Sequence, residues 1–493
     1  MHGDFTRDTF DPTKHYSCVL MQQGRVMLDA DWNEQTSIFL RYLRTLAVDV
    51  FGPHAGPSAN LGFEIIGNLT DPALQNKLAP LGLDPDRLNS VKASIGESDM
   101  LIAPGRYYVD GLLVENEKPI LYTEQLGYPF DDDTTLKALR GFQGGMLLYL
   151  DVWERDVTFL QDESLREVAL GGPDTCSRAQ VVWQLRVLRQ PPNAYTFSCN
   201  SISLLSTAHG TLRAQVPQGK APSDLCVIPP QSRYRGVENR LYRVEIHRSG
   251  TASGDANAAT FKWSRDNGSV AFPIHSLKDN KAKLQSLGRD RRTTLNSGDW
   301  VELLDEHIVA SGAAGTLVQV ETPPDLDTRT VTLKPPGNAK LTEYDDGDPL
   351  RPMLRRWDHP GNLDEFSGAL AVTAQPNGAD GLPNGWIELE DGVQIWFAQN
   401  QNYSSGDYWL IPARTATGNI EWPQQPSKGK DSVAAALPPR GPKHHYAPIW
   451  LSLPFSGPAA GTRRNQDCRC RIERLPCAGY AYALGSQGIG PNF

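Results

Sequence analysis

Two histidines and three cysteines near the C-terminal end of the chain are the residues best suited to bind a metal. They are His444, His445, Cys468, Cys470 and Cys477. Structural zinc sites normally use a Cys-x₂₋₄-Cys spacing, whereas a single residue separates Cys468 from Cys470. Adjacent histidines also seldom ligate the same ion. We therefore predict no zinc site, no other bound metal and no cofactor.

Acidic residues near the N-terminal end resemble the first half of a calcium-binding loop. They are Asp29, Asp31, Asn33 and Glu34. The full loop needs a glycine at its sixth position and a glutamate at its twelfth, but Glu34 and Leu40 occupy those positions here. Asp31 and Glu34 also have the spacing of a helix capping box. We favour the helix cap and expect no calcium site.

Catalytic motifs are missing from the sequence. It contains no Gly-x-Ser-x-Gly elbow, Walker loop, Gly-x-Gly-x-x-Gly fingerprint or His-Glu-x-x-His pair. Glu388 and Glu390 share one face of an expected strand, as paired glycosidase carboxylates do. However, the Asp391-Gly392 turn that follows predicts that both face solvent. We name no catalytic residue and consider an enzyme the less favoured interpretation.

Aromatic residues close to turns support an alternative function, a carbohydrate-binding or glycan-cleaving module acting at a target cell envelope. The candidate glycan-stacking residues, which we expect to be exposed because they lie near turns, are Tyr403, Tyr408, Trp409 and Trp422. Aromatic side chains stack well on flat apolar surfaces, but they are also common in β-sandwich cores and at protein interfaces. An open groove lined by such rings and two carboxylates would distinguish this alternative.

One helix is expected between Asp31 and the Gly52-Pro53 stop, and a weaker one near residues 73–81. Apolar residues recur along the first helix with a period of 3.6 and predict its buried stripe. They are Ile38, Phe39, Tyr42, Leu43, Leu46 and Val50. Arg41 and Arg44 are expected to flank this stripe in solvent.

Almost everything after the first helix alternates with period two, and 44 glycines and 37 prolines favour short strands joined by turns. Asp110-Gly111 and Asp391-Gly392 each predict a hairpin, because both residues tolerate the positive φ angles of a type I′ turn. Val181, Trp183, Leu185 and Val187 are expected to share one strand face. Tyr242, Val244 and Ile246 are expected to share another, opposite Arg243, Glu245 and His247.

The predicted fold class is therefore mainly β, with tandem β-sandwich or small-barrel domains, an N-terminal arm and one amphipathic helix. A chain of 493 residues is long enough for several domains. The division that we expect is an arm and capped helix at 1–55, β domains at 56–140, 141–240, 241–355 and 356–465, and a C-terminal tail at 466–493.

Charge and cysteine usage argue against several classes of protein. The net charge is −9 and no basic cluster is large, so we expect no nucleic-acid binding. No run approaches the length of a membrane span, so we expect no direct span of a membrane. The seven cysteines are scattered and odd in number, which predicts free thiols in a reducing cytosol.

The first thirty residues alternate apolar anchors with charges and predict an extended docking arm. The candidate partner-docking residues are Phe5, Phe10, Tyr16, Val19 and Val26. A free arm with so many anchors would expose apolar surface without compensation. We expect it to be pinned either across the β domains of its own chain or on a neighbouring subunit, and we favour the neighbour.

Several motifs resemble an uncharacterised bacterial family whose members occur alongside phage-tail-like contractile injection systems. The motifs are GDFTRDTF at 3–10, MQQGRV at 21–26, LDADWNE at 28–34, YLDVWE at 149–154, ALGGPDT at 169–175, ENRLY at 238–242, FKWSR at 261–265 and HHYAP at 444–448. The resemblance covers most of residues 1–470 and implies no catalytic residues. It implies a structural or accessory component, at the baseplate or periphery of such a particle, with the other subunits as partners. It also implies assembly in the cytoplasm, with the particle then released or held near a membrane.

Overall fold

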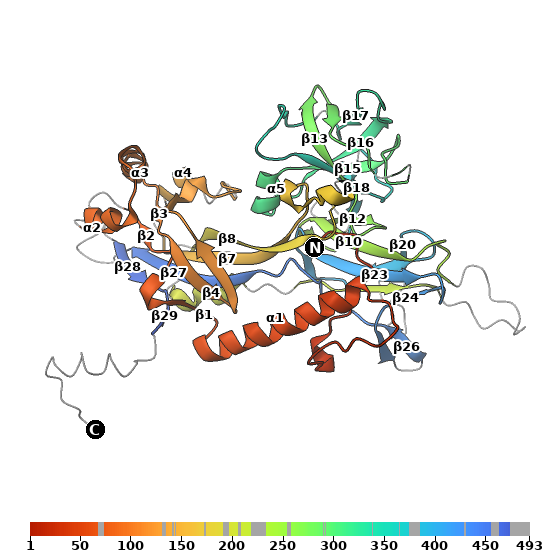
Figure 1. Cartoon of the computed structure of the whole chain (residues 1–493), viewed down its shortest axis with the longest axis horizontal. Helices are drawn as coiled ribbons and strands as arrows, with labels where there is room; N and C mark the ends of the chain where they lie inside the picture. Colours follow the sequence, from red (N-terminus) through yellow and green to blue (C-terminus); the bar gives the residue numbers. More distant parts are fainter. Residues whose placement is uncertain are drawn as a thin grey trace, which may run out of the picture.

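A computed structural model of the protein describes most of residues 1–473 (Figure 1). The residues left out of the description are 68–72, 131–134, 141, 143, 172–173, 191–196, 206–208, 218–232, 254–257, 289, 291, 338, 364, 374–384, 428–429, 455–462 and 474–493. The predicted fold class is confirmed, because strands account for 36 % of the structure and helices for 19 %, and one set of strands closes into a barrel.

In one half of the molecule, strands from the N-terminal part of the chain pair with strands from its C-terminal part. A four-stranded sheet has the order β28-β27-β7-β8, with bounds Arg463–Asp467, His445–Pro454, Met146–Val157 and Arg178–Arg189. A second sheet has the order β29-β1-β4-β5, with bounds Arg471–Ile472, His54–Pro57, Gly105–Val109 and Leu112–Asn116. As predicted, the face of β8 that carries Val181, Trp183, Leu185 and Val187 packs on the core between these sheets.

A small helical layer caps this half of the molecule. Its sheet has the order β2-β3-β6, with bounds Ile65–Ile66, Leu101–Ile102 and Ile120–Leu121. The helices are α2 (Leu74–Leu78), η3 (Ala79–Leu81) and α3 (Pro85–Gly96). The expected helix near residues 73–81 is therefore present. Helix α3 was not predicted, although Asp84 caps it by accepting a hydrogen bond from the Arg87 amide and Pro85 occupies its first turn.

The other half is built on a five-stranded sheet, β19-β12-β10-β23-β24. Its bounds are Leu370–Ala371, Thr260–Ser264, Arg240–Arg248, Tyr408–Arg414 and Asn419–Ile420. Three small sheets accompany it: β20-β21-β9 (Ile387–Glu388, Gln394–Phe397, Leu212–Gln215), β11-β22 (Gly250–Thr251, Asn402–Tyr403) and β25-β26 (Gln424–Ser427, Lys430–Ala434). As predicted, Tyr242, Val244 and Ile246 point into one core from the same face of β10.

A closed barrel sits on this sheet, at the top of the view in Figure 1. Its order is β13-β14-β17-β16-β15-β18, with bounds Ala271–Lys278, Lys281–Leu284, Thr330–Lys334, Thr316–Thr322, Trp300–Leu304 and Met353–Trp357. The short helix α5 (Glu306–Ser311) follows β15, and α4 (Leu136–Arg140) lies on the other half.

The sheets do not follow the linear domain division expected from the sequence. β10 and β12 fall in the expected 241–355 region but pair with β23 and β19, from the expected 356–465 region. β29 falls in the expected tail but pairs in parallel with β1. Pairing partners this far apart in sequence leave no local signal, and hydrophobic patterning alone could not reveal them.

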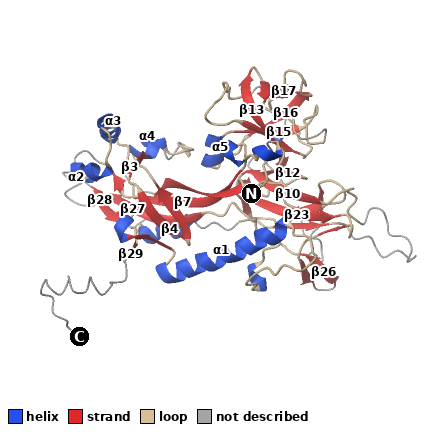
Figure 2. Ribbon diagram, viewed as in Figure 1, coloured by secondary structure: helices blue, strands red, loops and turns tan. Residues whose placement is uncertain are grey.

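The longest helix, α1 (Asp29–Phe51), lies along the lower edge of both halves in Figures 1 and 2. It ends at Gly52, as predicted, with a φ angle of +82° at that glycine. It begins two residues before the expected cap, because Asp31 accepts from the Leu28 amide at 3.3 Å instead of capping the first turn itself. Among the described residues, no helix combines the length and apolar character needed to cross a membrane.

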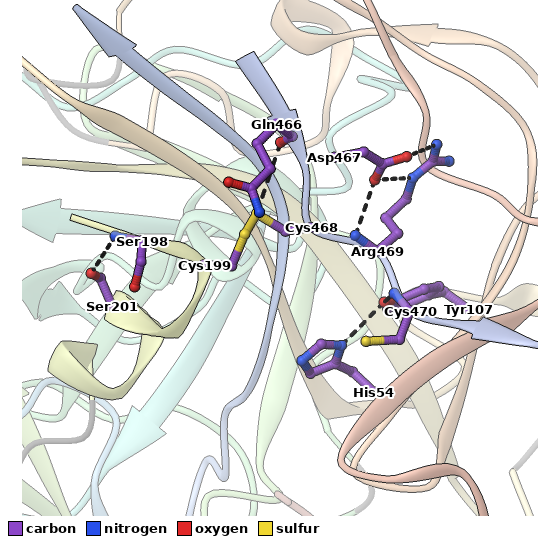
Figure 3. Close-up of a disulfide and its surroundings, with 10 residues drawn as sticks. All are labelled: His54, Tyr107, Ser198, Cys199, Ser201, Gln466, Asp467, Cys468, Arg469 and Cys470. Carbon is purple, nitrogen blue, oxygen red and sulfur yellow. Dashed lines mark hydrogen bonds and ion pairs between the residues drawn. A yellow bond between two sulfur atoms is a disulfide. The ribbon is translucent and has the colours of Figure 1, made fainter. Parts of the chain in front are cut away.

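A disulfide joins Cys199 to Cys468 (Figure 3). The expectation of free thiols is therefore wrong for these two residues, while Cys18, Cys176 and Cys470 are free and exposed. Residues 199 and 468 are 269 positions apart in sequence, so their spacing gives no sign of the bond. Cys226 and Cys477 lie outside the described residues.

Candidate functional site

The contacts that α1 makes with the rest of its chain are largely polar. Glu34 accepts a hydrogen bond from the Thr9 hydroxyl, and the Gln35 side-chain oxygen accepts one from the Val19 amide at 2.7 Å. Arg44 pairs with Glu154 of β7. Ala30 and Ile38 are the buried residues of this helix. Hydrogen bonds and this ion pair are therefore the main interactions that hold α1 against its own chain.

The apolar stripe of α1 points away from the body. The exposed fractions are 67 % for Trp32, 63 % for Phe39, 63 % for Leu43, 61 % for Leu46 and 64 % for Val50. Leu40, Tyr42 and Phe51 are also exposed. The predicted burial of this stripe is therefore wrong, with Ile38 as the exception, and Arg41 and Arg44 lie partly buried on the body side. The periodicity identifies the apolar positions of α1, but the face that meets the body is the opposite one.

The exposed stripe has the spacing of a coiled-coil seam. Its positions are Trp32, Thr36, Phe39, Leu43, Leu46 and Val50, so successive members alternate four and three residues apart. This alternation is the heptad pattern that lets one helix pack against another by knobs-into-holes contacts. Exposed contiguous apolar surface of this kind marks interaction sites in soluble proteins. We refer to these six residues as the α1 seam.

A tight turn fixes the position of α1 on the body. In the β4–β5 hairpin, Asp110 and Gly111 have φ angles of +46° and +77°, which confirms the predicted type I′ turn. A Cβ atom added to Gly111 would lie 2.6 Å from the Cα atom of Arg44. The turn therefore touches the backbone of α1 on the side away from the seam, and only glycine allows that approach.

The first ten residues of the arm lie on the protein's own β domains. The His2 ring lies 3.1 Å from Glu245, and the Gly3 carbonyl accepts from the Asn267 side chain at 2.9 Å. Arg7 pairs with Glu421, and Asp8 pairs with Arg440. Figure 1 shows the N-terminus at the centre of the molecule, between the two halves and the barrel. The first ten residues are therefore bound to the β domains of their own chain.

The candidate docking residues divide into two groups. Phe5 and Phe10 are partly buried in the segment that lies on the protein's own chain, and Val19 is partly buried as well. Tyr16 and Val26 are exposed, at 53 % and 82 %. Further exposed apolar residues accompany them: Leu20, Met21, Met27 and Leu28. The second half of the arm therefore carries exposed apolar residues of its own, in the segment that leads into α1.

A buried network of charges joins the five-stranded sheet to the barrel beneath the arm. Glu245 of β10 contacts Arg243 at 2.5 Å and Lys262 at 3.2 Å, and Lys262 also reaches Glu302 of the barrel at 2.5 Å. The Trp357 indole donates to the same Glu302 carboxylate at 2.9 Å. The polar face predicted for β10 is therefore buried rather than solvated.

The pKa shifts in this network favour fixed charges. Burial by itself raises the pKa of Glu245, but Arg243 and Lys262 outweigh it and hold the pKa well below its usual range. Burial, together with Arg243, lowers the pKa of His2 well below its usual range, so the ring is neutral at neutral pH. Each carboxylate is already paired with a cation. The network is therefore better suited to holding the barrel against the sheet than to transferring protons.

The aromatic residues proposed for glycan stacking are not available for it. Tyr403, Trp409 and Trp422 are buried, because alternate residues of β23 and its neighbours fill the core of the sheet. Tyr408 is half-buried, and the guanidinium of Arg243 covers its ring at 3.6 Å. The expectation that these four rings are exposed is therefore wrong.

The other candidate groups are paired with neighbours. Glu390 receives two hydrogen bonds from Arg265, and Glu388 pairs with Arg235. His444 contacts Asp151 at 2.6 Å, whereas His445 contacts Asp110 at 2.8 Å, so each histidine has its own carboxylate. Within the part of the chain that the structure describes, no group of three His, Cys, Asp or Glu residues could hold a metal.

A hollow of about 340 Å³ lies beside β19. Its described lining comprises Phe261, Pro360, Asn362, Glu365, Ala369, Leu370, Ala371, Thr373 and Ile387. Glu365 is the one charged residue among them. A single carboxylate in an apolar hollow does not provide the paired acid and base that hydrolysis needs.

The fold and the surface define a mainly β protein that carries an outward-facing apolar helix. The chain belongs to the family of unknown function DUF6519, which matches residues 1–198 and 200–490. No curated protein and no solved structure matches it. Its function therefore has to be argued from its own surface.

Proposed function

We propose that this protein is a structural component of a multi-protein particle and acts through protein–protein interfaces. The observation that carries the proposal is the α1 seam, an apolar helix face directed away from the protein's own core. Three aromatic side chains of α1, Trp32, Phe39 and Tyr42, leave roughly 350 Å² exposed, at about 200 Å² per fully exposed ring. That area alone matches the largest apolar patch of a typical monomer.

The way the helix is held supports an interface role. Arg44, the Gly111 turn and the first ten residues fix α1 by polar contacts and one close backbone approach. A helix held in this way keeps a defined orientation while its apolar side remains available. A rigid, preformed surface loses less conformational entropy on binding than a mobile one.

We further propose that the particle is a phage-tail-like contractile injection system, with this chain at the baseplate or periphery. The motif resemblance described above supports this setting. The Cys199–Cys468 disulfide supports a stage outside the reducing cytosol, since such bonds persist in oxidising surroundings. Assembly in the cytoplasm followed by release of the particle accommodates both observations.

The test is the assembly of particles in the native host. Leu43→Glu places a charge on the seam, and Thr45→Glu places the same charge at an exposed residue of α1 outside the seam. Tagged versions of both are expressed in place of the native chain, and particles are separated by density-gradient sedimentation and imaged. We expect Leu43→Glu to be lost from particles and Thr45→Glu to be retained. Retention of both variants at normal occupancy, or the absence of any large assembly containing the chain, overturns the proposal.

A further inference from the structure

We infer that the α1 seam binds the α1 seam of a second copy of this chain, in antiparallel orientation, to form a two-fold symmetric dimer. This inference rests on the proposed function and names the partner of its interface. A two-fold interface uses the same surface on both copies, so the surface must be complementary to itself. Three properties of the seam meet that requirement.

The first property is the match between layers when the helix is reversed. If two copies pair so that contacting residue numbers add up to 82, Trp32 lies opposite Val50, Thr36 opposite Leu46, and Phe39 opposite Leu43. A large side chain then meets a smaller one in the Trp32 and Phe39 layers. In a parallel pair, Trp32 would meet Trp32 and Thr36 would meet Thr36, which crowds one layer and underfills the next.

The second property is the lack of charge repulsion along the seam. The residues that flank it are Asn33, Gln35, Leu40, Tyr42, Ala47 and Asp49. In the antiparallel register Asp49 lies beside Gln35 of the other copy, so no like charges meet. Coiled coils that select a different partner usually encode that choice by charges at these flanking positions, and here five of the six residues are uncharged.

The third property is the area of the surface. At about 200 Å² per aromatic side chain and roughly 100 Å² per aliphatic one, the exposed apolar residues between 32 and 51 offer roughly 650 Å² per copy. Complete burial of these side chains, the flanking Leu40, Tyr42 and Phe51 included, would remove about 1,300 Å² from water over two copies, within the range of about 1,200–2,000 Å² for stable interfaces.

Light scattering of the purified full-length chain over a range of concentrations tests the dimer. We expect a dimer whose dissociation constant rises by at least about 30-fold in Phe39→Glu and in Leu46→Glu, as at interface hot spots. Thr45→Glu should change it by about twofold at most. Circular dichroism and melting temperature show whether each variant is folded, and we expect all three to melt close to the unmodified chain.

Cysteine cross-linking tests the orientation without relying on loss of binding. The parent chain for this experiment retains Cys199 and Cys468. Its remaining five cysteines are replaced by serine: Cys18, Cys176, Cys226, Cys470 and Cys477. Trp32→Cys and Val50→Cys are introduced on separate chains that differ in length by a tag. Under mild oxidation, the antiparallel arrangement gives the mixed 32–50 cross-link. The 32–32 and 50–50 cross-links indicate a parallel pair and overturn the inference.

The two proposals fail in different ways. A chain that stays monomeric at every concentration overturns the self-pairing, and so does a dimer that Phe39→Glu and Leu46→Glu leave intact. If the chain is monomeric but Leu43→Glu is still lost from native particles, the seam binds a different subunit and the proposed function stands. If the seam variants change neither dimerisation nor particle assembly, both proposals are wrong.

Discussion

Arg44 on α1 forms a two-pronged ion pair with Glu154 on β7, with nitrogen–oxygen distances of 3.0 and 2.7 Å. Bidentate pairs of this kind fix orientation as well as position. This pair turns Arg44 toward the body and, because the helix is rigid, turns Phe39, Leu43 and Leu46 away from it. Together with the Gly111 turn and the hydrogen bonds to Glu34 and Gln35, this pair sets which side of the amphipathic helix remains exposed.

The first prediction compares Arg44 with its neighbour on the seam. Arg44→Ala should lower the free energy of unfolding by about 1–2 kcal/mol, because the pair is partly shielded from solvent. Leu43→Ala should cost about 0.5 kcal/mol or less in the monomer, since its side chain contacts mostly water. Urea titration at a protein concentration low enough to keep the chain monomeric measures both. A larger loss at Leu43 than at Arg44 would show that the helix face is misassigned.

The second prediction concerns the turn that touches α1. Gly111→Ala should lower stability by about 2–4 kcal/mol, because it adds a strained positive φ angle to a steric clash with the backbone of Arg44. Gly82→Ala is the matched control, since Gly82 also has a positive φ angle but no atom lies within 4 Å of its added Cβ. That control should cost only about 1 kcal/mol. Equal losses of stability at the two positions would mean that the close approach of Gly111 to α1 does not contribute to stability.

The third prediction concerns the disulfide. Cys468→Ser should lower the free energy of unfolding by about 2–5 kcal/mol, because the bond closes a very long loop in the unfolded chain. Cys470→Ser, two residues away at an exposed free thiol, is the control and should be close to neutral. Denaturant titration with and without a reducing agent separates the effects, since reduction should destabilise the unmodified chain but not Cys468→Ser. Mass spectrometry of the intact chain confirms the bond.

Local chemistry explains the parts of this fold that could be predicted from the sequence. Asp391 and Gly392 have φ angles of +50° and +84°, as a type I′ hairpin turn requires, and the other Asp-Gly turn behaves in the same way. The segments before Trp300 and before Tyr408 also share one turn: Asp299 accepts from the Asn296 amide and Asp407 from the Ser404 amide. In each case, the residues that determine the structure are neighbours in the sequence.

The candidate site depended on non-local partners and was predicted only in part. Periodicity identified α1 and its apolar positions, but it could not say which side meets the body, because that depends on Glu154 and Gly111. Exposure of Trp409 was predicted from its nearness to a turn, yet β23 pairs with β10 and carries the ring into the core. A heptad count over residues 32–50 identifies the seam positions from the sequence, since an alternation of four and three is the spacing at which one helix packs against another.

The last prediction is a loss of stability in mild acid through His359. This ring is buried beside Trp300, donates a hydrogen bond from Nε2 to the Gly368 carbonyl at 2.9 Å, and has its pKa lowered to about 4 by burial. An unfolded histidine has a pKa of about 6.5. Between these two pKa values the histidine is protonated in the unfolded chain but neutral in the folded chain. The free energy of unfolding therefore falls as the pH is lowered from about 6.5 to 4.

The histidine contributes roughly 3 kcal/mol to this loss over the whole interval, since each pKa unit corresponds to about 1.4 kcal/mol. His359→Gln keeps a donor for the Gly368 carbonyl but cannot titrate. Urea titrations of both proteins at several pH values should give a shallower loss of stability below pH 6.5 in the variant, whatever its stability at neutral pH. Other groups titrate in the same range, but they are common to both proteins and cancel in the difference. Parallel pH profiles would show that the ring is protonated in the folded state, and hence that the interior around Trp300 admits a charge.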